Sequence, residues 1–173
     1  MKWILILLLL SPVTAKCVSP QKPSDILFFI ERNLNKNRVV YKANFDSDGT
    51  LQTKDPIKIH WIMHEENGES ESLNYMEKKI AYGITCVQEN SSKSVFNVKL
   101  VADETHSFIL KQIAPFEAQL TTVIKGVTVK LTRLFINADN SSYWPNVKYV
   151  LIEGIELKTQ QLISDKIRPG SNN

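Results

Sequence analysis

The residues with the clearest potential for chemistry lie in one polar loop, Asn44–Asp55. Laid on the twelve-position calcium loop, this segment places oxygen-bearing residues at positions 1, 3, 5, 9 and 12 and glycine at position 6. Asp46, Asp48 and Asp55 are therefore candidate calcium ligands, because hard cations bind rings of oxygen atoms. However, the first position is asparagine, the last is an aspartate too short to bind in a bidentate way, and the flanks alternate like strands. These departures favour a hairpin loop whose Asp-Gly pair supplies the turn.

The sequence gives less support for a site built from histidine, cysteine or carboxylate side chains. His60 and His64 lie in a segment that alternates as a strand, where a rise of about 3.3 Å per residue separates them by roughly 13 Å, too far for one metal ion. Cys86 lies in an apolar strand, where burial raises the thiol pKa and makes a poor nucleophile. The acidic run Glu65–Glu71 could hold the carboxylate pair of a hydrolase, or form a solvated loop that favours the N-terminus of a following helix. The sequence contains no nucleophile elbow, glycine-rich phosphate loop or paired-cysteine zinc motif.

Aromatic residues on or beside the expected strands indicate a ligand cavity. Trp61, Tyr82, Phe108 and Trp144 are the candidate ligand-binding residues, because an eight-stranded barrel can hold one small ligand in its interior. The same rings could equally fill a hydrophobic core, which is their commonest use. Trp144 stands in a polar segment before a proline, and an exposed ring there would favour binding.

The first residues predict export. Residues 1–15 combine Lys2, an apolar run from Ile4 to Leu10 and a cleavage site ending at Ala15, which is the pattern of a secretory signal peptide. The run is shorter than the roughly 20 apolar residues that a membrane-spanning helix needs. We therefore expect a periplasmic or extracellular protein with no transmembrane segment after cleavage.

Two cysteines remain after the expected cleavage, Cys17 and Cys86. In an oxidising compartment they could form a disulfide that ties the N-terminus to the domain. The alternative is a buried thiol at Cys86, and only geometry separates the two. A lipoprotein would carry its lipid on Cys17, but the residue before such a cysteine is normally small and here it is Lys16, which disfavours lipidation.

Period-two alternation of β-branched and aromatic residues dominates the rest of the chain. Leu27–Arg32 and Val39–Phe45 predict a hairpin across an Asn-rich turn, and Lys125-Gly126 predicts a tight turn. Further strands are expected at 57–64, 96–100, 106–113, 118–124, 127–136 and 147–157, the last with a bulge at Gly154. About eight strands joined by short turns predict a mainly β fold. We expect an antiparallel, calycin-like β-barrel, whose closure removes exposed edges, or else a β-sandwich.

One segment breaks this alternation. Apolar residues at helical spacing predict an α-helix over Glu71–Ala81, with Ser70 as its N-cap and Gly83 just past its end. Residues 16–157 are expected to form a single β-rich domain, because this length supports one hydrophobic core. The polar stretch 158–173 is expected to be a loose tail.

Composition narrows the function classes. A net charge of +3 over 173 residues, with basic residues interspersed among acids, argues against a nucleic-acid partner. Hydrophobic residues at 43% and charged residues at 23% are ordinary for a globular domain. No cofactor is expected, since no cofactor-binding motif is present.

Several short motifs resemble those of a known family. They are Phe28–Asn33, Asn37–Tyr41, Asp55-Pro56, His60-Trp61-Ile62, Leu73-Asn74-Tyr75 and Ala81-Tyr82-Gly83. With these motifs the chain resembles, over about Leu27–Leu157, a domain of unknown function found in small bacterial cell-envelope proteins with N-terminal export signals. The resemblance implies a bacterial source, export and one β-rich domain. It implies no activity and no functional residue.

Three functional hypotheses follow. The first is non-enzymatic binding of a small, partly apolar ligand inside the β-barrel, which predicts an internal cavity. The second is a surface interaction module for another envelope protein or a glycan, which predicts a filled core and exposed aromatic loops. The third is a hydrolase that uses carboxylates near Glu65–Glu71, which predicts titratable groups with perturbed pKa values in one cleft.

Overall fold

The computed structural model describes residues 25–89, 92, 94–139 and 146–168. The predicted signal peptide at residues 1–15, Cys17 and Trp144 lie outside this part of the chain. None of the helices within the described ranges has the length and apolar character needed to cross a membrane.

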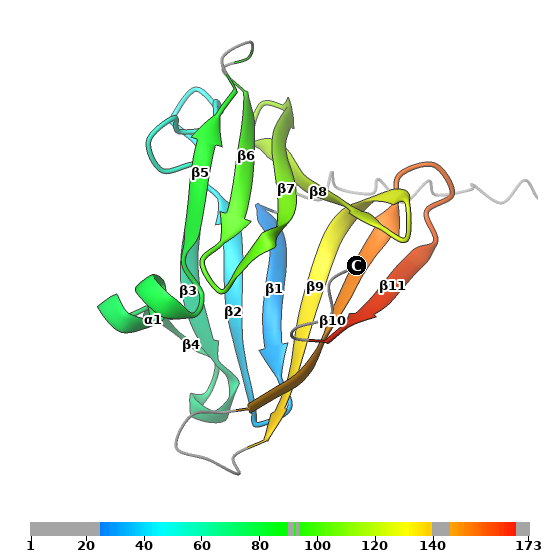
Figure 1. Cartoon of the computed structure of the whole chain (residues 1–173). Coiled ribbons are helices and arrows are strands. Elements are labelled where there is room, and N and C mark those ends of the chain that lie inside the picture. Colours follow the sequence, from blue (N-terminus) through cyan, green and yellow to red (C-terminus); the bar gives the residue numbers. More distant parts are fainter. Residues whose placement is uncertain (1–24, 90–91, 93, 140–145, 169–173) are drawn as a thin grey trace, which may run out of the picture.

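The eleven strands form one sheet in the order β4-β3-β2-β1-β9-β8-β7-β6-β5, with β10 paired to β9 and β11 paired to β10 (Figure 1). In the first half of the chain they are β1 (Ile26–Arg32), β2 (Asn35–Ala43), β3 (Ile57–Met63), β4 (Glu69–Ser72) and β5 (Ile84–Gln88). The second half contributes β6 (Val95–Leu100), β7 (Asp103–Ala114), β8 (Glu117–Ile124), β9 (Val127–Asp139), β10 (Asn146–Glu156) and β11 (Leu162–Ile167). A 3-10 helix, η1 (His64–Glu66), and a short helix, α1 (Tyr75–Ile80), connect β3 to β5 around β4.

The sheet curls into an open half-barrel (Figure 1). The mainly β class is confirmed, whereas neither a closed barrel nor a two-sheet sandwich is. The strands pair antiparallel except for β1 and β9, whose residues Phe29–Arg32 lie parallel to Arg133–Ile136. This parallel pair joins the first strand to the C-terminal half of the chain, so the β1–β2 hairpin lies inside the sheet rather than at its edge.

Alternation places one face of each strand in a shared core. Within β1 and β2, the predicted hairpin forms around Phe28, which stacks on Tyr41 with ring centroids 4.1 Å apart. The fully buried side chains come from both arms of the curled sheet: Tyr41, Phe28, Phe96, Phe108, Leu110, Leu120, Leu131, Val39, Val98 and Val129. Burial of this size is the dominant stabilising contribution to such a domain.

The helix is shorter than predicted and begins later. Residues 69–72 form the edge strand β4, hydrogen-bonded to β3, so Ser70 is a strand residue and not an N-cap. Asn74 caps α1 instead. Its side chain accepts the backbone N–H of Glu77, and the Glu77 side chain accepts the backbone N–H of Asn74. This reciprocal capping box satisfies two backbone donors that Ser70 could not reach.

Two further details of this segment differ from the sequence pattern. The apolar residues at helical spacing in this segment are Leu73, Met76 and Ile80. Met76 and Ile80 are exposed, and only Leu73, which precedes α1, enters the core. Gly83 is required by a close approach rather than by a C-cap, because a Cβ there would lie 1.8 Å from the Lys78 carbonyl oxygen.

The polar ending is also ordered beyond expectation. The stretch predicted as a loose tail contains β11, whose residues Leu162–Ile167 pair antiparallel with β10. Ile163 and Ile167 pack against the core, and Lys125 donates to the Ser164 carbonyl oxygen at 2.9 Å. The prediction was wrong because Ser164, Asp165 and Lys166 separate the two isoleucines and make the segment polar in sequence.

The predicted turn and bulge are both present. Lys125 and Gly126 have positive φ of 50° and 78°, the conformation of a tight hairpin turn. Strand pairing shifts register between Glu153 and Gly154. A Cβ at Gly154 would lie 2.4 Å from Val129 Cγ2 and 2.7 Å from the Lys130 carbonyl oxygen, so the glycine lets β10 approach β9 closely.

We predict that Gly154→Ala lowers the free energy of unfolding by about 2 kcal/mol, because the added methyl group forces β10 away from β9. Urea denaturation measures this loss. Ser164→Ala on the neighbouring strand β11 is the matched control, since Ser164 is exposed, and it should leave the midpoint unchanged. Equal midpoints for Gly154→Ala and the natural chain would contradict the close approach.

Candidate functional site

A cavity lies where the core face of the first three strands turns polar. Phe28 and Ile30 of β1 are buried in the core, and the next residue on that face is Arg32. Likewise, Asn35 and Asn37 precede the buried Val39 on β2. The resulting hollow, named here the Trp61 cavity, has a volume of about 320 Å³ and is lined by Arg32, Asn35, Asn37, Trp61, Met63, Glu71, Ser72, Asn74 and Glu77. This is at the lower end of the range for small-molecule sites.

Arg32 is held by two aromatic rings. Its guanidinium carbon lies 5.1 Å from the centroid of Trp61 and 5.7 Å from that of Tyr82. The two rings meet edge to face, with centroids 5.2 Å apart. Burial raises the pKa of Tyr82, and the positive charge of Arg32 opposes that shift. The stack therefore keeps a cation at a fixed place in an aromatic setting.

Two polar atoms of the cavity lack a hydrogen-bond partner. Arg32 Nε and Asn35 Oδ1 are both inaccessible to solvent and unpaired among the described residues. A buried donor or acceptor left unpaired costs about 1–3 kcal/mol, so proteins rarely retain one without a reason. One is a donor and the other an acceptor, and their residues, Arg32 and Asn35, line the same cavity.

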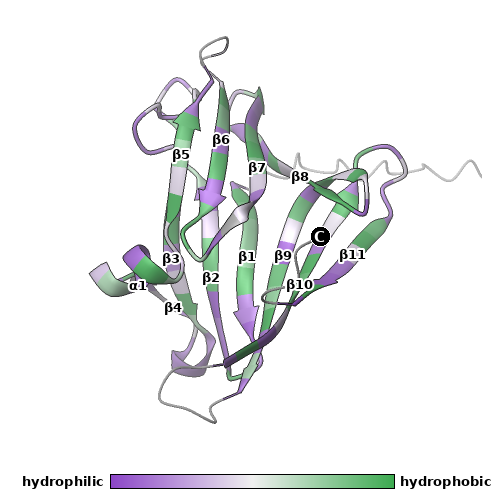
Figure 2. Cartoon of the chain, viewed as in Figure 1, coloured by the Kyte–Doolittle hydropathy of each residue, from purple (hydrophilic) through white to green (hydrophobic). Residues whose placement is uncertain are grey.

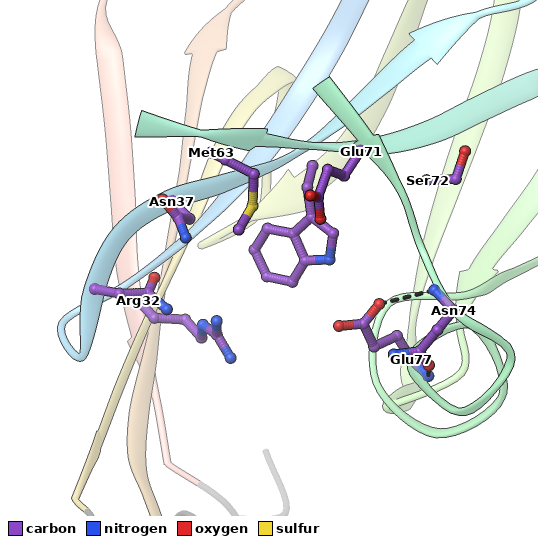
Figure 3. A pocket seen from close by; sticks show the side chains of 9 residues that line it. Arg32, Asn37, Met63, Glu71, Ser72, Asn74 and Glu77 are labelled. Atoms are coloured by element: carbon purple, nitrogen blue, oxygen red, sulfur yellow. Dashed lines mark hydrogen bonds between the residues drawn. The ribbon is translucent and has the colours of Figure 1, made fainter. Parts of the chain in front are cut away.

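Carboxylates form the opposite side of the cavity. Glu71 lies on β4 directly across from Trp61 of β3. Figure 3 shows Arg32 and Glu77 facing each other across the hollow, with Glu77 bonded to the Asn74 backbone. Hydrophilic residues also gather at β4 and η1, beside the end of β3 (Figure 2). The cavity thus offers one cation, two carboxylates and an indole within a small volume.

The structure separates the four predicted ligand-binding residues. Trp61 lines the cavity and Tyr82 packs against it, so these two come together. Phe108 is 1% exposed within the core and does not line the Trp61 cavity. Trp144 lies outside the described residues. A binding role for Trp61 and Tyr82 stays a prediction that their position supports.

Of the acidic run Glu65–Glu71, only Glu71 lines the Trp61 cavity. Glu65 has a structural task, since its Oε1 accepts the backbone N–H of Lys36 at 3.1 Å. Sequence reasoning missed Arg32, Asn35 and Asn37. A signal was available, because these residues continue a buried apolar face with polar side chains on both strands of one hairpin.

In the loop considered as a calcium site, Asn44–Asp55, the candidate ligand residues make hydrogen bonds within the loop itself. Asp48 Oδ1 accepts the backbone N–H and the hydroxyl of Thr50, which lowers the pKa of Asp48. Asp46 Oδ1 accepts from the Gln52 amide, and Asp55 contributes its carbonyl oxygen to Asn44. No three His, Cys, Asp or Glu side chains within the described ranges are grouped as metal ligands. Calcium binding by this loop stays a prediction.

Gln112 of β7 fastens this loop to the sheet. Its amide nitrogen donates to the carbonyl oxygens of Gly49 and Ala114, and its amide oxygen accepts the Leu51 N–H. Gly49 has φ of 84°, and a Cβ there would lie 2.8 Å from the ring of Phe116. The Asp-Gly turn is therefore part of the packing between this loop and β7.

The remaining candidates are spread over the fold. His60 lies on β3 and His64 begins η1, and desolvation by burial, followed by the charge of Lys42, lowers the pKa of His60. Cys86 is half-buried on β5, where burial, followed by the charge of Asp55, raises the thiol pKa to about 11. Cys17, its predicted disulfide partner, lies outside the described residues.

The fold and the site together define a class: a mainly β half-barrel domain with a small polar and aromatic cavity at one end. A family model described as "Domain of unknown function (DUF4833)" matches residues 28–166, most of the chain. The protein belongs to this family. No curated protein and no solved structure matches the chain.

We predict that Gln112→Ala lowers the free energy of unfolding by about 2 kcal/mol, because the Leu51 N–H and the Gly49 carbonyl lose their partner. Thermal unfolding followed by circular dichroism measures the change. Gln119→Ala on β8 is the control, since its amide makes none of these bonds, and it should shift the midpoint less. Equal shifts for the two variants would contradict the fastening role.

We predict that Cys86 in the Cys17→Ser chain reacts with iodoacetamide with a midpoint near pH 11, because burial disfavours the thiolate. The unfolded chain releases this proton near the ordinary value of 9.0. Unfolding therefore releases a proton between these two values, and the folded state loses stability as pH rises through that window. Alkylation rates measured by mass spectrometry from pH 7 to 12 test this. A native midpoint near 9 would contradict the burial of the thiol.

Proposed function

We propose that the mature chain is an exported, non-enzymatic binding protein that holds a small, partly apolar ligand in the Trp61 cavity. The observation that carries the proposal is the pair of buried, unpartnered atoms, Arg32 Nε and Asn35 Oδ1, among the described residues. The residues that carry these atoms line a hollow that is also lined by the indole of Trp61. A ligand that supplies an acceptor to one atom and a donor to the other removes the cost of leaving them unpaired.

The cavity chemistry describes the ligand further. Glu71 and Glu77 accept hydrogen bonds from donor groups, and Trp61 and Met63 offer apolar surface. A molecule with an apolar side and several hydroxyl or amide groups meets both demands. A volume of about 320 Å³ limits it to a small molecule or one end of a larger one.

Export is supported by the sequence alone. The first fifteen residues have the basic start, apolar run and cleavage pattern of a signal peptide. The likeness to exported bacterial envelope proteins points the same way. We therefore place the cavity in the periplasm or outside the cell.

Two other functions are favoured by particular observations. Glu71 and Glu77 line the same cavity, which supports a carboxylate-based hydrolase. Alternatively, Tyr75, Met76 and Ile80 of α1 are 72%, 54% and 48% exposed, which supports an interaction module for an envelope protein or glycan. The binding proposal ranks first because it alone accounts for the two unpaired atoms.

The first experiment is native mass spectrometry of the protein purified without denaturation from the cells that make it. Extra mass that disappears on denaturation identifies the ligand, and a mass equal to the bare chain favours the interaction module. A recovered molecule that the protein converts into a product would establish the hydrolase instead.

We predict that Glu71→Gln weakens binding of the recovered molecule about tenfold, because a charge-assisted hydrogen bond becomes a neutral one. Isothermal titration calorimetry measures the affinity. Glu69→Gln is the matched control, since Glu69 lies on the same strand but does not line the cavity. If both variants bind as tightly as the natural chain, the ligand does not occupy the Trp61 cavity.

A further inference from the structure

A second cavity lies around the β1–β2 hairpin end, with a volume of about 450 Å³. It is lined by Glu31, Arg32, Asn35, Lys36, Arg38, His64 and Phe135. We propose that this cavity, the hairpin cavity, binds an oxyanion group, a phosphate or a carboxylate. The site goes beyond the Trp61 cavity, and because Arg32 and Asn35 line both cavities, an anion here competes for them with any ligand of the Trp61 cavity.

Charge in the hairpin cavity is the first argument. Glu31 is its acidic lining residue, and it is already neutralised by Arg38 and by Arg133, whose Nε lies 2.6 Å from it. Arg133 Nη1 in turn donates to Glu153 at 3.0 Å. These two arginines and two glutamates therefore form a network with no net charge.

The remaining cations are left without such compensation. Arg32 and Lys36 take part in none of the ion pairs found between described residues. Glu65 is hydrogen-bonded to this segment, since its side chain accepts the backbone N–H of Lys36. Glu71 and Glu77 face Arg32 from the Trp61 cavity and do not line the hairpin cavity. The charged side chains that do line it, Glu31, Arg32, Lys36 and Arg38, sum to two positive charges, which attract an anion.

The preorganisation of Arg32 is the second argument. Trp61 and Tyr82 hold its guanidinium group in place, so little side-chain entropy is lost when an anion binds. Its Nε is buried and has no partner among the described residues. A planar guanidinium binds a carboxylate or phosphate through two parallel hydrogen bonds.

The test is a nuclear magnetic resonance titration of the ¹⁵N-labelled mature protein with inorganic phosphate and, separately, with acetate. Ionic strength is held constant with sodium chloride, so that general screening does not change along the titration. We expect saturable shifts of the Arg32 Nε–H and the Lys36 amide. Saturation by phosphate alone identifies a phosphate site, and saturation by both ions identifies a general oxyanion site.

Lys36→Gln should weaken the phosphate affinity about fivefold, because one of the two uncompensated charges is lost. Arg32→Gln should weaken it about tenfold or more. Lys58→Gln is the matched control: Lys58 is an exposed lysine of β3 that does not line the hairpin cavity, and this variant should bind as the natural chain does. Lys36 is also exposed, so its variant stays informative even if Arg32→Gln fails to fold.

The proposal is overturned if neither ion produces saturable shifts at Arg32 and Lys36. It is also overturned if Lys36→Gln and Lys58→Gln weaken binding equally, since phosphate then responds to overall charge only. Neither result bears on the Glu71 test of the Trp61 cavity, because Glu71 does not line the hairpin cavity.

Discussion

One buried hydrogen bond organises the end of the half-barrel that holds the cavities. The Tyr41 hydroxyl, deep in the core and stacked on Phe28, donates to the Tyr82 carbonyl oxygen at 2.7 Å. Burial raises the pKa of Tyr41 far above its usual value, so this donor keeps its proton. The bond fixes the chain just after α1 against β2. Tyr82 is thereby placed against Trp61, and the two rings together position Arg32.

The outer face of the sheet stabilises the same region by a different means. The parallel pairing of β1 with β9 brings Glu31 beside Arg133, although the two residues are far apart in the chain. Arginines also cover aromatic rings on this face, Arg38 over Phe29 and Arg133 over Phe135. Cations stacked on rings allow an open sheet to expose aromatic residues without a contiguous apolar patch.

These arrangements leave Arg32 as the residue that the Trp61 cavity and the hairpin cavity share. An apolar residue at position 32 could pack between the two rings equally well. Arg32 adds the cost of a buried Nε that has no hydrogen-bond partner among the described residues. A ligand group that pairs with this Nε would offset the cost of leaving it unpaired.

The sequence by itself determined the local features of this protein. The β1–β2 hairpin, the Lys125-Gly126 turn and the Gly154 bulge were readable because each depends on alternation or backbone conformation within a few residues. Strands β4 and β11 were missed because they are rich in polar and charged residues and form strands through pairing with β3 and β10. The cavities were decided by tertiary structure alone. Arg32 meets Glu71 in the Trp61 cavity and Phe135 in the hairpin cavity through strand order and register. Both follow from the packing of the whole sheet rather than from any one segment.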